Sequence, residues 1–376
     1  MMRVRTLLLG ASSLALFFSL SWYFSLGYFA QSLLGQLELI VKRRPILTLL
    51  DWPGTPPELN RKLKLILDVR RFAVEELGLP DNGSYSSYTP LDRPYVVWNV
   101  MATPELSFEP ERWCFPFIGC QAYAGYFSEG NARRYASRLS STGEDVYVSG
   151  VAAYSTLGWF SDPVPSTLLR WDDAQLVNYV IHELAHQILY VPGDTAFNEA
   201  FAVAVAKHGV RRWLERNATP LDLAEFHAAG EREREFVTLV METRQQLVSL
   251  YGQAIPPRNM RGNKALILKE MRAKYAALRS KWGGFRGYDT FMNEGLNNAK
   301  LSSIVTYQEH ARAFDNLFDA TSGRFDEIYR IATQLGNMSY DNRTACLKDL
   351  TLGTAAACVS LEASNGTGVR TPDSET

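Results

Sequence analysis

Apolar residues recur every three or four positions along several stretches of the chain, and this spacing predicts helices that each bury one face. The clearest stretch covers residues 57–79 and stops at the polar turn over residues 80–84. Its apolar positions are Leu59, Leu63, Leu65, Ile66, Val69, Phe72, Ala73 and Leu77. Further helices are expected over residues 31–44, 172–190, 196–215, 219–250, 261–282, 297–314 and 326–335.

Two shorter stretches, residues 95–100 and 145–151, are rich in Val, Trp and Tyr and predict strands. Residues 101–165 are rich in aromatic residues, Gly and Pro, whereas nearly everything after Asp172 has helical spacing. The pattern therefore predicts a mostly helical α+β fold, in which a small upstream sheet precedes a C-terminal helical part. The expected divisions are residues 1–30, a helical region over 31–95, a main domain over 96–355, and a tail over 356–376 that is disordered from about residue 365.

The N-terminal division has the pattern of a membrane segment. Two arginines lie within residues 1–5, and residues 6–30 then contain no charged side chain. A helix of about 25 residues spans the roughly 30 Å core of a bilayer. A cleaved signal peptide would be shorter and would end on small residues, which Tyr28, Phe29 and Ala30 do not provide. An uncleaved single-pass transmembrane helix with a cytoplasmic N-terminus is favoured over a signal peptide, and both interpretations export the body of the chain.

Composition narrows the class of protein. The chain has 376 residues, of which 46% are hydrophobic and 21% charged, and its formal net charge is -1. These values are typical of a folded protein that is long enough for one large core or two smaller ones. A chain without an excess of basic residues is not expected to bind nucleic acid.

Four cysteines agree with export. Cys114 and Cys120 are close in sequence, as are Cys346 and Cys358. An even number of cysteines in an exported protein predicts two disulfides, 114–120 and 346–358, and four buried free thiols are the alternative. Neither pair has the C-x-x-C spacing, so metal binding by these cysteines is not expected.

The chain contains one pattern that carries chemistry, His-Glu-x-x-His at residues 182–186. Positions i and i+4 lie on one face of a helix, so His182 and His186 can bind one zinc ion. Zinc lowers the pKa of a bound water, and Glu183 is placed to take its proton. The residues around the motif are apolar, so the helix is expected to be buried. Buried histidines need partners, and the alternative to a metal is ordinary hydrogen bonding.

The third ligand is expected to be Glu199. The turn at residues 192–194 reverses the chain, and Glu199 lies near the start of the returning helix. Asp194 and His208 are weaker candidates, because Asp194 is more simply a helix cap and His208 lies nine residues further on. The strand at 145–151 and the following Tyr154 and Ser155 are candidates to bind an extended peptide, although an ordinary sheet strand explains the pattern equally well.

Segments outside the zinc motif also match those of a known protein family. The matching segments are Trp113–Pro116, Gly119, Cys120, Tyr123, Gly125–Phe127, Ala153–Pro163, His182–Gln187, Tyr190, Gly193, Asp194, Phe197–Glu199, Asn297–Ala299 and Tyr307. With these segments the chain resembles a bacterial family of predicted zinc-dependent aminopeptidases over about residues 25–350. Many members have a lipoprotein cysteine near positions 27–28. Residues 25–28 of this chain contain no cysteine, so a lipid anchor is not expected.

The resemblance implies a zincin-like fold and a gluzincin-type metal site with Glu199 as third ligand. It also implies active-site roles for two residues near the C-terminus: Tyr307 would donate a hydrogen bond to the oxyanion, and Asn298 would bind substrate. Helix packing and capping are the alternative roles for both.

The expected function is hydrolysis of peptide substrates by a metallopeptidase with one Zn²⁺ ion, and an aminopeptidase is favoured over an endopeptidase. Its expected place is the bacterial inner membrane, with the catalytic part in the periplasm. The alternative is a membrane-anchored, non-catalytic zinc protein with a structural or chaperone-like role. A structural site would be closed by a fourth protein ligand, whereas a catalytic site would have three.

Overall fold

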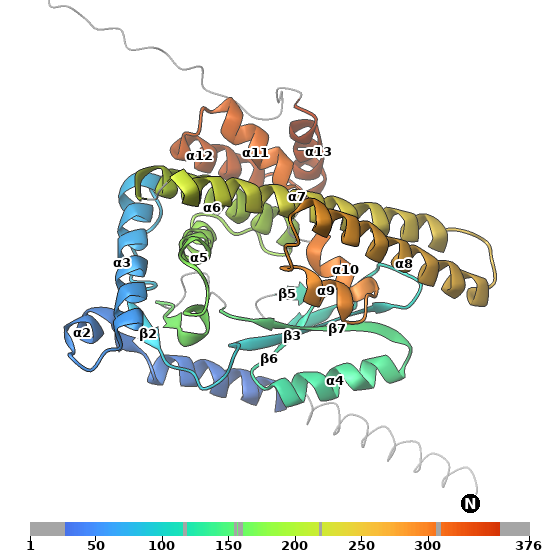
Figure 1. Cartoon of the computed structure of the whole chain (residues 1–376), viewed down its shortest axis with the longest axis horizontal. Coiled ribbons are helices and arrows are strands. Elements are labelled where there is room, and N and C mark those ends of the chain that lie inside the picture. Colours follow the sequence, from blue (N-terminus) through green and yellow to red (C-terminus); the bar gives the residue numbers. More distant parts are fainter. Residues whose placement is uncertain are drawn as a thin grey trace, which may run out of the picture.

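A computed structural model describes residues 27–115, 119–153, 156, 161–217, 220–305 and 310–353. Helices dominate this part of the chain, and the strands form three small sheets (Figure 1). The predicted mostly helical α+β class is therefore confirmed. None of the helices searched among these residues is long and apolar enough to cross a membrane. Most of the predicted membrane segment, residues 1–26, and the predicted tail, residues 356–376, lie outside the described residues.

Three helices from the middle of the chain form the main core. They are α3 (Pro57–Leu77), α5 (Asp173–Ala185) and α6 (Thr195–Asn217). Helix α3 begins on Pro57, which a first turn tolerates, and ends at Gly78, whose φ of 69° lies in the left-handed region. Gly209 of α6 lets the helices approach closely, because a Cβ atom there would lie 2.9 Å from Leu77 and 3.0 Å from Ile181.

The C-terminal helices cover the same core. They are α11 (Ala311–Ala320), α12 (Phe325–Gly336) and α13 (Tyr340–Thr351). Their buried Phe314, Ile331 and Leu347 belong to the same hydrophobic cluster as α3, α5 and α6. The helices that carry the zinc motif are therefore enclosed by segments from both ends of the described chain (Figure 1).

A second hydrophobic core lies between the two longest helices. Helices α7 (Pro220–Tyr251) and α8 (Pro257–Lys281) run side by side, and α9 (Asp289–Asn293) and α10 (Asn298–Val305) pack beside them (Figure 1). Phe236 of α7 stacks on Tyr288 with ring centroids 3.9 Å apart. Helix α10 also contacts the sheet strands, so this unit joins the helical layer to the sheet.

The largest regular pairing is in the sheet β6-β3-β7. Strand β3 (Val97–Pro104) pairs antiparallel with β6 (Ala124–Tyr126) and with β7 (Glu144–Val151). Helix α4 (Glu129–Ser141) covers one face of this sheet with buried Ala132 and Ala136. A second sheet has the order β1-β2-β8, from β1 (Arg44–Pro45), β2 (Ser87–Thr89) and β8 (Val164–Pro165). The two-stranded sheet of β4 (Trp113–Phe115) and β5 (Gly119–Gln121) completes the set.

The structure corrects the ends of several predicted elements. Residues 27–41 are helical, so the helix predicted over residues 31–44 ends three residues earlier than expected. Helix α5 ends at Ala185 instead of residue 190. The predicted helix over 297–314 is two helices, α10 and α11, which end at Val305 and begin at Ala311. Helix α2 (Ile46–Asp51) and helix α13 had no specific counterpart in the sequence pattern.

Candidate metal centre

The zinc motif occupies the last turn of a strongly capped helix. Asp172 accepts a hydrogen bond from the backbone of Gln175, and the Gln175 side chain accepts one in return from the backbone of Asp172. This capping box fixes where α5 begins. The starting residue in turn determines which side chains further along α5 lie on the same face. His182 and Glu183 lie in the last turn, and His186 is the C-terminal cap.

The chain then reverses through a turn that is held by side chains of α6. Asn198 is 1% exposed, and its carboxamide accepts from the amide of Val191 at 2.8 Å and donates to the Val191 carbonyl at 2.8 Å. Asp194 caps the start of α6 by accepting from the amide of Phe197 at 3.1 Å. Because Asn198 and Asp194 lie one and five residues before Glu199, these contacts fix the start of the helix that carries that carboxylate.

These two helices bring three ligand-type side chains to one point. The Nε2 atoms of His182 and His186 are 3.1 Å apart. Glu199 Oε2 lies 3.4 Å from Nε2 of His182, and Glu199 Oε1 lies 3.7 Å from Nε2 of His186. The three ligand atoms all lie within 4.8 Å of one another. The predicted set of metal ligands is therefore together, and it can hold a metal.

The chemistry of the three groups fits a cation such as zinc. In a tetrahedral site with Zn–N distances of 2.0–2.1 Å, two ligand nitrogens lie about 3.3 Å apart, close to the separation seen here. Glu199 Oε2 is buried and has no hydrogen-bond partner among the described residues. A buried carboxylate oxygen without a donor is costly, and a cation would satisfy it.

Burial and mutual charge act on the site in opposite directions. Burial raises the pKa of Glu199, but the adjacent imidazoles of His182 and His186 outweigh it and lower the pKa to about 2. Burial lowers the pKa of His182, but the adjacent carboxylate of Glu199 and the charge of Glu183 leave it raised overall. Burial raises the pKa of Glu183, against the lowering effect of the two histidines. Glu183 therefore lies within electrostatic range of both predicted histidine ligands.

The two weaker ligand candidates have other partners. Asp194 caps α6 and pairs with Arg343, whose Nη2 lies 2.7 Å from Asp194 Oδ2. His208 stacks on Phe318 with ring centroids 3.9 Å apart and lies 3.4 Å from Asp315. Among the described residues, the only group that could hold a metal has three members, and neither Asp194 nor His208 is one of them.

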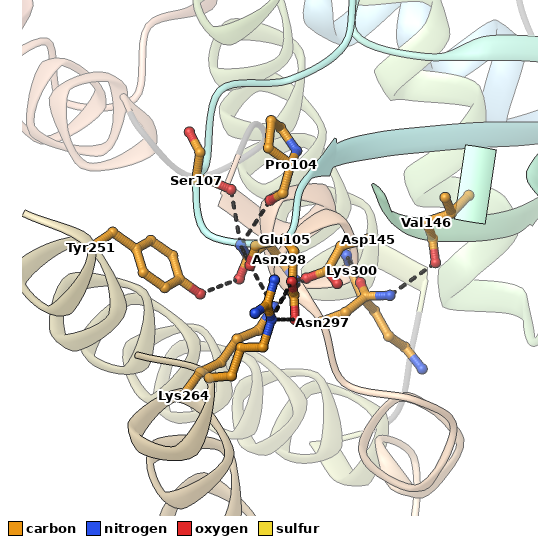
Figure 2. A network of polar contacts seen from close by, with 11 residues as sticks. Pro104, Glu105, Ser107, Asp145, Val146, Tyr251, Lys264, Asn297, Asn298 and Lys300 are labelled. Atoms are coloured by element: carbon orange, nitrogen blue, oxygen red, sulfur yellow. Dashed lines mark hydrogen bonds and ion pairs between the residues drawn. The ribbon is translucent and has the colours of Figure 1, made fainter. Parts of the chain in front are cut away.

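Asn298 lies in a buried polar network at the start of α10 (Figure 2). Its side chain is 0% exposed, and Nδ2 donates to the carbonyls of Glu105 and Ser107 at 3.0 and 2.9 Å. Its Oδ1 accepts from the Tyr251 hydroxyl at 2.8 Å, and its backbone amide donates to Asp145. These contacts tie α10 to α7 and to the ends of β3 and β7. The predicted substrate-binding role of Asn298 stays a prediction.

Lys264 and Asn297 complete the same network (Figure 2). Lys264 donates to Asp145 Oδ2 at 2.6 Å and to the Glu105 carbonyl at 2.7 Å. Asn297 donates to the Val146 carbonyl at 2.9 Å, and its own oxygen accepts from the amide of Lys300. These contacts are of the kind expected for the alternative roles of Asn298, helix capping and packing.

The other predicted substrate and oxyanion residues, Tyr154, Ser155 and Tyr307, lie outside the described residues. Asp162, at the end of the segment with Tyr154, is 3% exposed. Its carboxylate accepts from the amide and the hydroxyl of Thr156, both at 2.8 Å. Its negative charge also contributes to the raised pKa of Glu183, so this end of the segment lies near the metal centre.

Two tyrosines near the centre had no role assigned from sequence. Burial, followed by the charge of Glu199, raises the pKa of Tyr123 to about 12. The same two causes raise the pKa of Tyr190. Tyr123 lies between β5 and β6, far from the zinc motif in sequence, so spacing could not connect them. Its place among the matching segments was the one available signal.

The disulfide predictions are tested at three of the four cysteines. Cys114 and Cys120 form a disulfide that closes the β4–β5 hairpin. Cys346 is buried in α13 and is disulfide-bonded, whereas Cys358 lies outside the described residues. The first predicted disulfide is therefore confirmed.

Fold and site together define a mostly helical α+β protein with a His-His-Glu centre that can hold a metal. The chain belongs to the family described as "Putative aminopeptidase", whose sequence model matches residues 27–347. This confirms the family resemblance seen in the motifs, over nearly the extent expected. No curated protein and no solved structure matches the chain.

Proposed function

We propose that this protein is a zinc-dependent aminopeptidase whose catalytic centre is formed by His182, Glu183, His186 and Glu199. The observation that carries the proposal is the convergence of two imidazoles and one carboxylate, with all ligand atoms within 4.8 Å of one another. Family membership supports a peptide substrate. The fold class expected from the resemblance, a zincin-like peptidase domain, is part of the same proposal.

The ligand number supports catalysis over a structural site. Structural zinc sites have four protein ligands, whereas catalytic sites have three and leave a position for water or substrate. The described group has three members. Asp194 and His208, the residues that would have closed a structural site, are engaged with Arg343 and Asp315.

Zinc bound here would polarise the scissile carbonyl and make water acidic enough to ionise near neutral pH. Glu183 would accept the proton of the attacking water and pass it to the leaving amine. Its location within electrostatic range of both histidines supports this role. Tyr307 is proposed as the hydrogen-bond donor to the oxyanion, and Tyr154 and Ser155 as residues that position the peptide.

A single substitution separates chemistry from metal binding. Glu183→Gln should retain bound zinc but lower kcat by about 10²–10⁴-fold, because only the proton acceptor is lost. Zinc content by atomic emission and peptide hydrolysis would be measured on the same preparation. Glu215→Gln, at an exposed position of α6, is the matched control and should keep both. Full activity in Glu183→Gln, or purified protein without zinc, would refute the proposal.

The preference for an exopeptidase has its own test. An aminopeptidase must bind the free ammonium group of its substrate, so N-acetylation of a peptide should abolish cleavage. An endopeptidase would cleave free and acetylated peptides at similar rates.

We also propose that the catalytic part lies in the periplasm, attached to the inner membrane by the apolar N-terminal segment. Protease accessibility in spheroplasts against intact cells tests that location.

A further inference from the structure

The helix over residues 27–41 exposes the side that should be buried. Its exposed large apolar side chains repeat every three or four positions and so form one stripe, which we call the outward face. The outward face consists of Phe29, Leu33, Leu34, Leu37 and Val41, of which Leu34 is 67% and Val41 79% exposed. A helix on the surface of a water-soluble protein shows the opposite pattern, with its apolar stripe toward the core.

Polar groups on the opposite side of this helix contact the rest of the protein. The Gln31 carboxamide accepts from the amide of Phe127 at 2.8 Å. Glu38 pairs with Arg93 at 2.6 Å, and the carbonyl of Leu39 accepts from the Thr89 hydroxyl.

The helix is therefore fixed in rotation. A Cβ atom on Gly35 would lie 2.1 Å from the Phe127 ring, so that ring fits only against a glycine. Rolling the helix to bury its leucines would break the Gln31, Glu38 and Leu39 contacts together. The outward face is thus a stable feature of the fold, and it needs an apolar environment outside the protein.

The next helix also exposes large apolar side chains. In α2, Leu47 is 66% exposed, and Trp52, which caps its C-terminus, is 57% exposed. Figure 1 shows the helix over residues 27–41 (dark blue) and α2 along the periphery of the molecule. Tryptophan is common where a protein meets the boundary between lipid chains and headgroups, and the exposed Trp52 agrees with such a surface.

Charge and sequence continuity indicate which apolar environment this is. Lys42, Arg43 and Arg44 follow the outward face directly, and all three are exposed. Basic residues beside an apolar helix face favour anionic lipid headgroups. On the other side, the helix adjoins residues 6–30, which carry no charged side chain. An anionic bilayer explains the basic residues on one side of the outward face and the uncharged segment on the other. A second protein chain would explain only the apolar character of the face.

We propose that the outward face, with Leu47 and Trp52, lies in the interfacial layer of an anionic lipid bilayer. The folded body of the protein would then rest on the membrane in a defined orientation, beyond any attachment by residues 6–30. This inference does not depend on the proposed peptidase activity.

Depth-dependent fluorescence on the full chain tests the proposal. An environment-sensitive NBD group would be attached through a bioorthogonal amino acid at Leu34 or Leu37, which leaves the native disulfides alone. Leu266 of α8, 64% exposed, is the matched control site. The protein would be reconstituted into vesicles of phosphatidylcholine with phosphatidylglycerol, with and without nitroxide groups on the acyl chains. We expect a blue-shifted emission and strong quenching at positions 34 and 37, and neither at 266.

Two results would overturn the proposal. Emission at 34 and 37 that matches position 266 would place the outward face in water. Blue-shifted emission without quenching by the lipid nitroxide would mean that protein, such as a second copy of this chain, covers it. As a second measurement, Leu34→Gln with Leu37→Gln should reduce lipid quenching of NBD at Val41. The exposed control pair Leu266→Gln with Val248→Gln should not, and equal quenching in both variants would also refute the proposal.

Discussion

Arg343 and Asp194 form a buried ion pair between residues that are 149 positions apart in sequence. Nε and Nη2 of Arg343 lie 2.8 and 2.7 Å from Asp194 Oδ2, and the two residues are 4% and 6% exposed. The other carboxylate oxygen of Asp194 caps α6, five residues before Glu199. The pair therefore joins the C-terminal helix α13 to the turn that positions a predicted metal ligand.

Arg343→Met should destabilise the fold and weaken metal binding together. Removing one partner of a buried pair leaves an uncompensated charge, at a cost of about 3–5 kcal/mol in the free energy of unfolding. Groups that orient metal ligands typically change metal affinity by about 10–100-fold. Urea denaturation and zinc competition with a chelating dye measure the two effects. Arg133→Met removes the Arg133–Glu129 pair of α4, whose side chains are 67% and 43% exposed, and should cost less than about 1 kcal/mol with unchanged zinc affinity.

Glu199→Gln should weaken zinc binding by more than about a hundredfold, beyond the effect of losing an orienting group. The substitution keeps the shape of the side chain but removes the anionic ligand, which is 18% exposed and lies against both histidines. Equilibrium dialysis with a zinc buffer would measure the affinity. Glu215→Gln lies on the same helix with a 53% exposed carboxylate and serves as the control. Unchanged affinity in Glu199→Gln would assign the third ligand elsewhere.

Asp315 should make stability depend on pH in the acid range. Burial raises its pKa, but hydrogen bonds from His208 and Lys207 outweigh this and lower the pKa below the ordinary 3.8. Its stabilising effect is therefore complete above pH 3.8 and is lost as the pH falls through the lowered value. Asp315→Asn should cost about 1 kcal/mol at pH 7 and less at pH 3, measured by urea denaturation with a chelator present. An equal difference at both pH values would contradict this.

Asn298→Ala should destabilise the junction between the sheet and the second core. The substitution leaves the Ser107 carbonyl without its amide donor and the Tyr251 hydroxyl without its acceptor, whereas the Glu105 carbonyl keeps its hydrogen bond from Lys264. Each unsatisfied buried group costs about 1–3 kcal/mol, so a loss of about 3 kcal/mol in the free energy of unfolding is expected. Asn293→Ala, at an exposed position of α9, should change stability by less than about 0.5 kcal/mol. A higher KM with unchanged stability would instead support the substrate-binding role of Asn298.

The group that could hold a metal was predictable because the relationship among its three residues is mostly local. His182 and His186 are four residues apart on one helix, and helical geometry alone places them together. Glu199 follows after one short turn, so chain reversal brings it back within a few ångströms. The Cys114–Cys120 disulfide, with a sequence separation of 6, was predictable for the same reason.

Contacts between distant segments were beyond the sequence pattern. Spacing identified Asp194 as a helix cap, but only folding brings Arg343 to it from α13. Tyr123 comes within electrostatic range of Glu199 although it lies between β5 and β6, far from α6 in sequence. Such neighbours are set by how whole helices and sheets pack, which depends on many weak contacts and not on any local repeat.

The sequence by itself determined the apolar N-terminal segment, the helical phase of the zinc motif and the family to which the chain belongs. Tertiary structure decided which way each helix faces. Leu33 and Leu37 have the same spacing as core leucines, yet they are exposed because Gln31, Glu38 and Gly35 bind the other side of their helix. Periodicity defines a stripe on a helix, but only the packing partners determine whether that stripe meets the core or the surroundings of the protein.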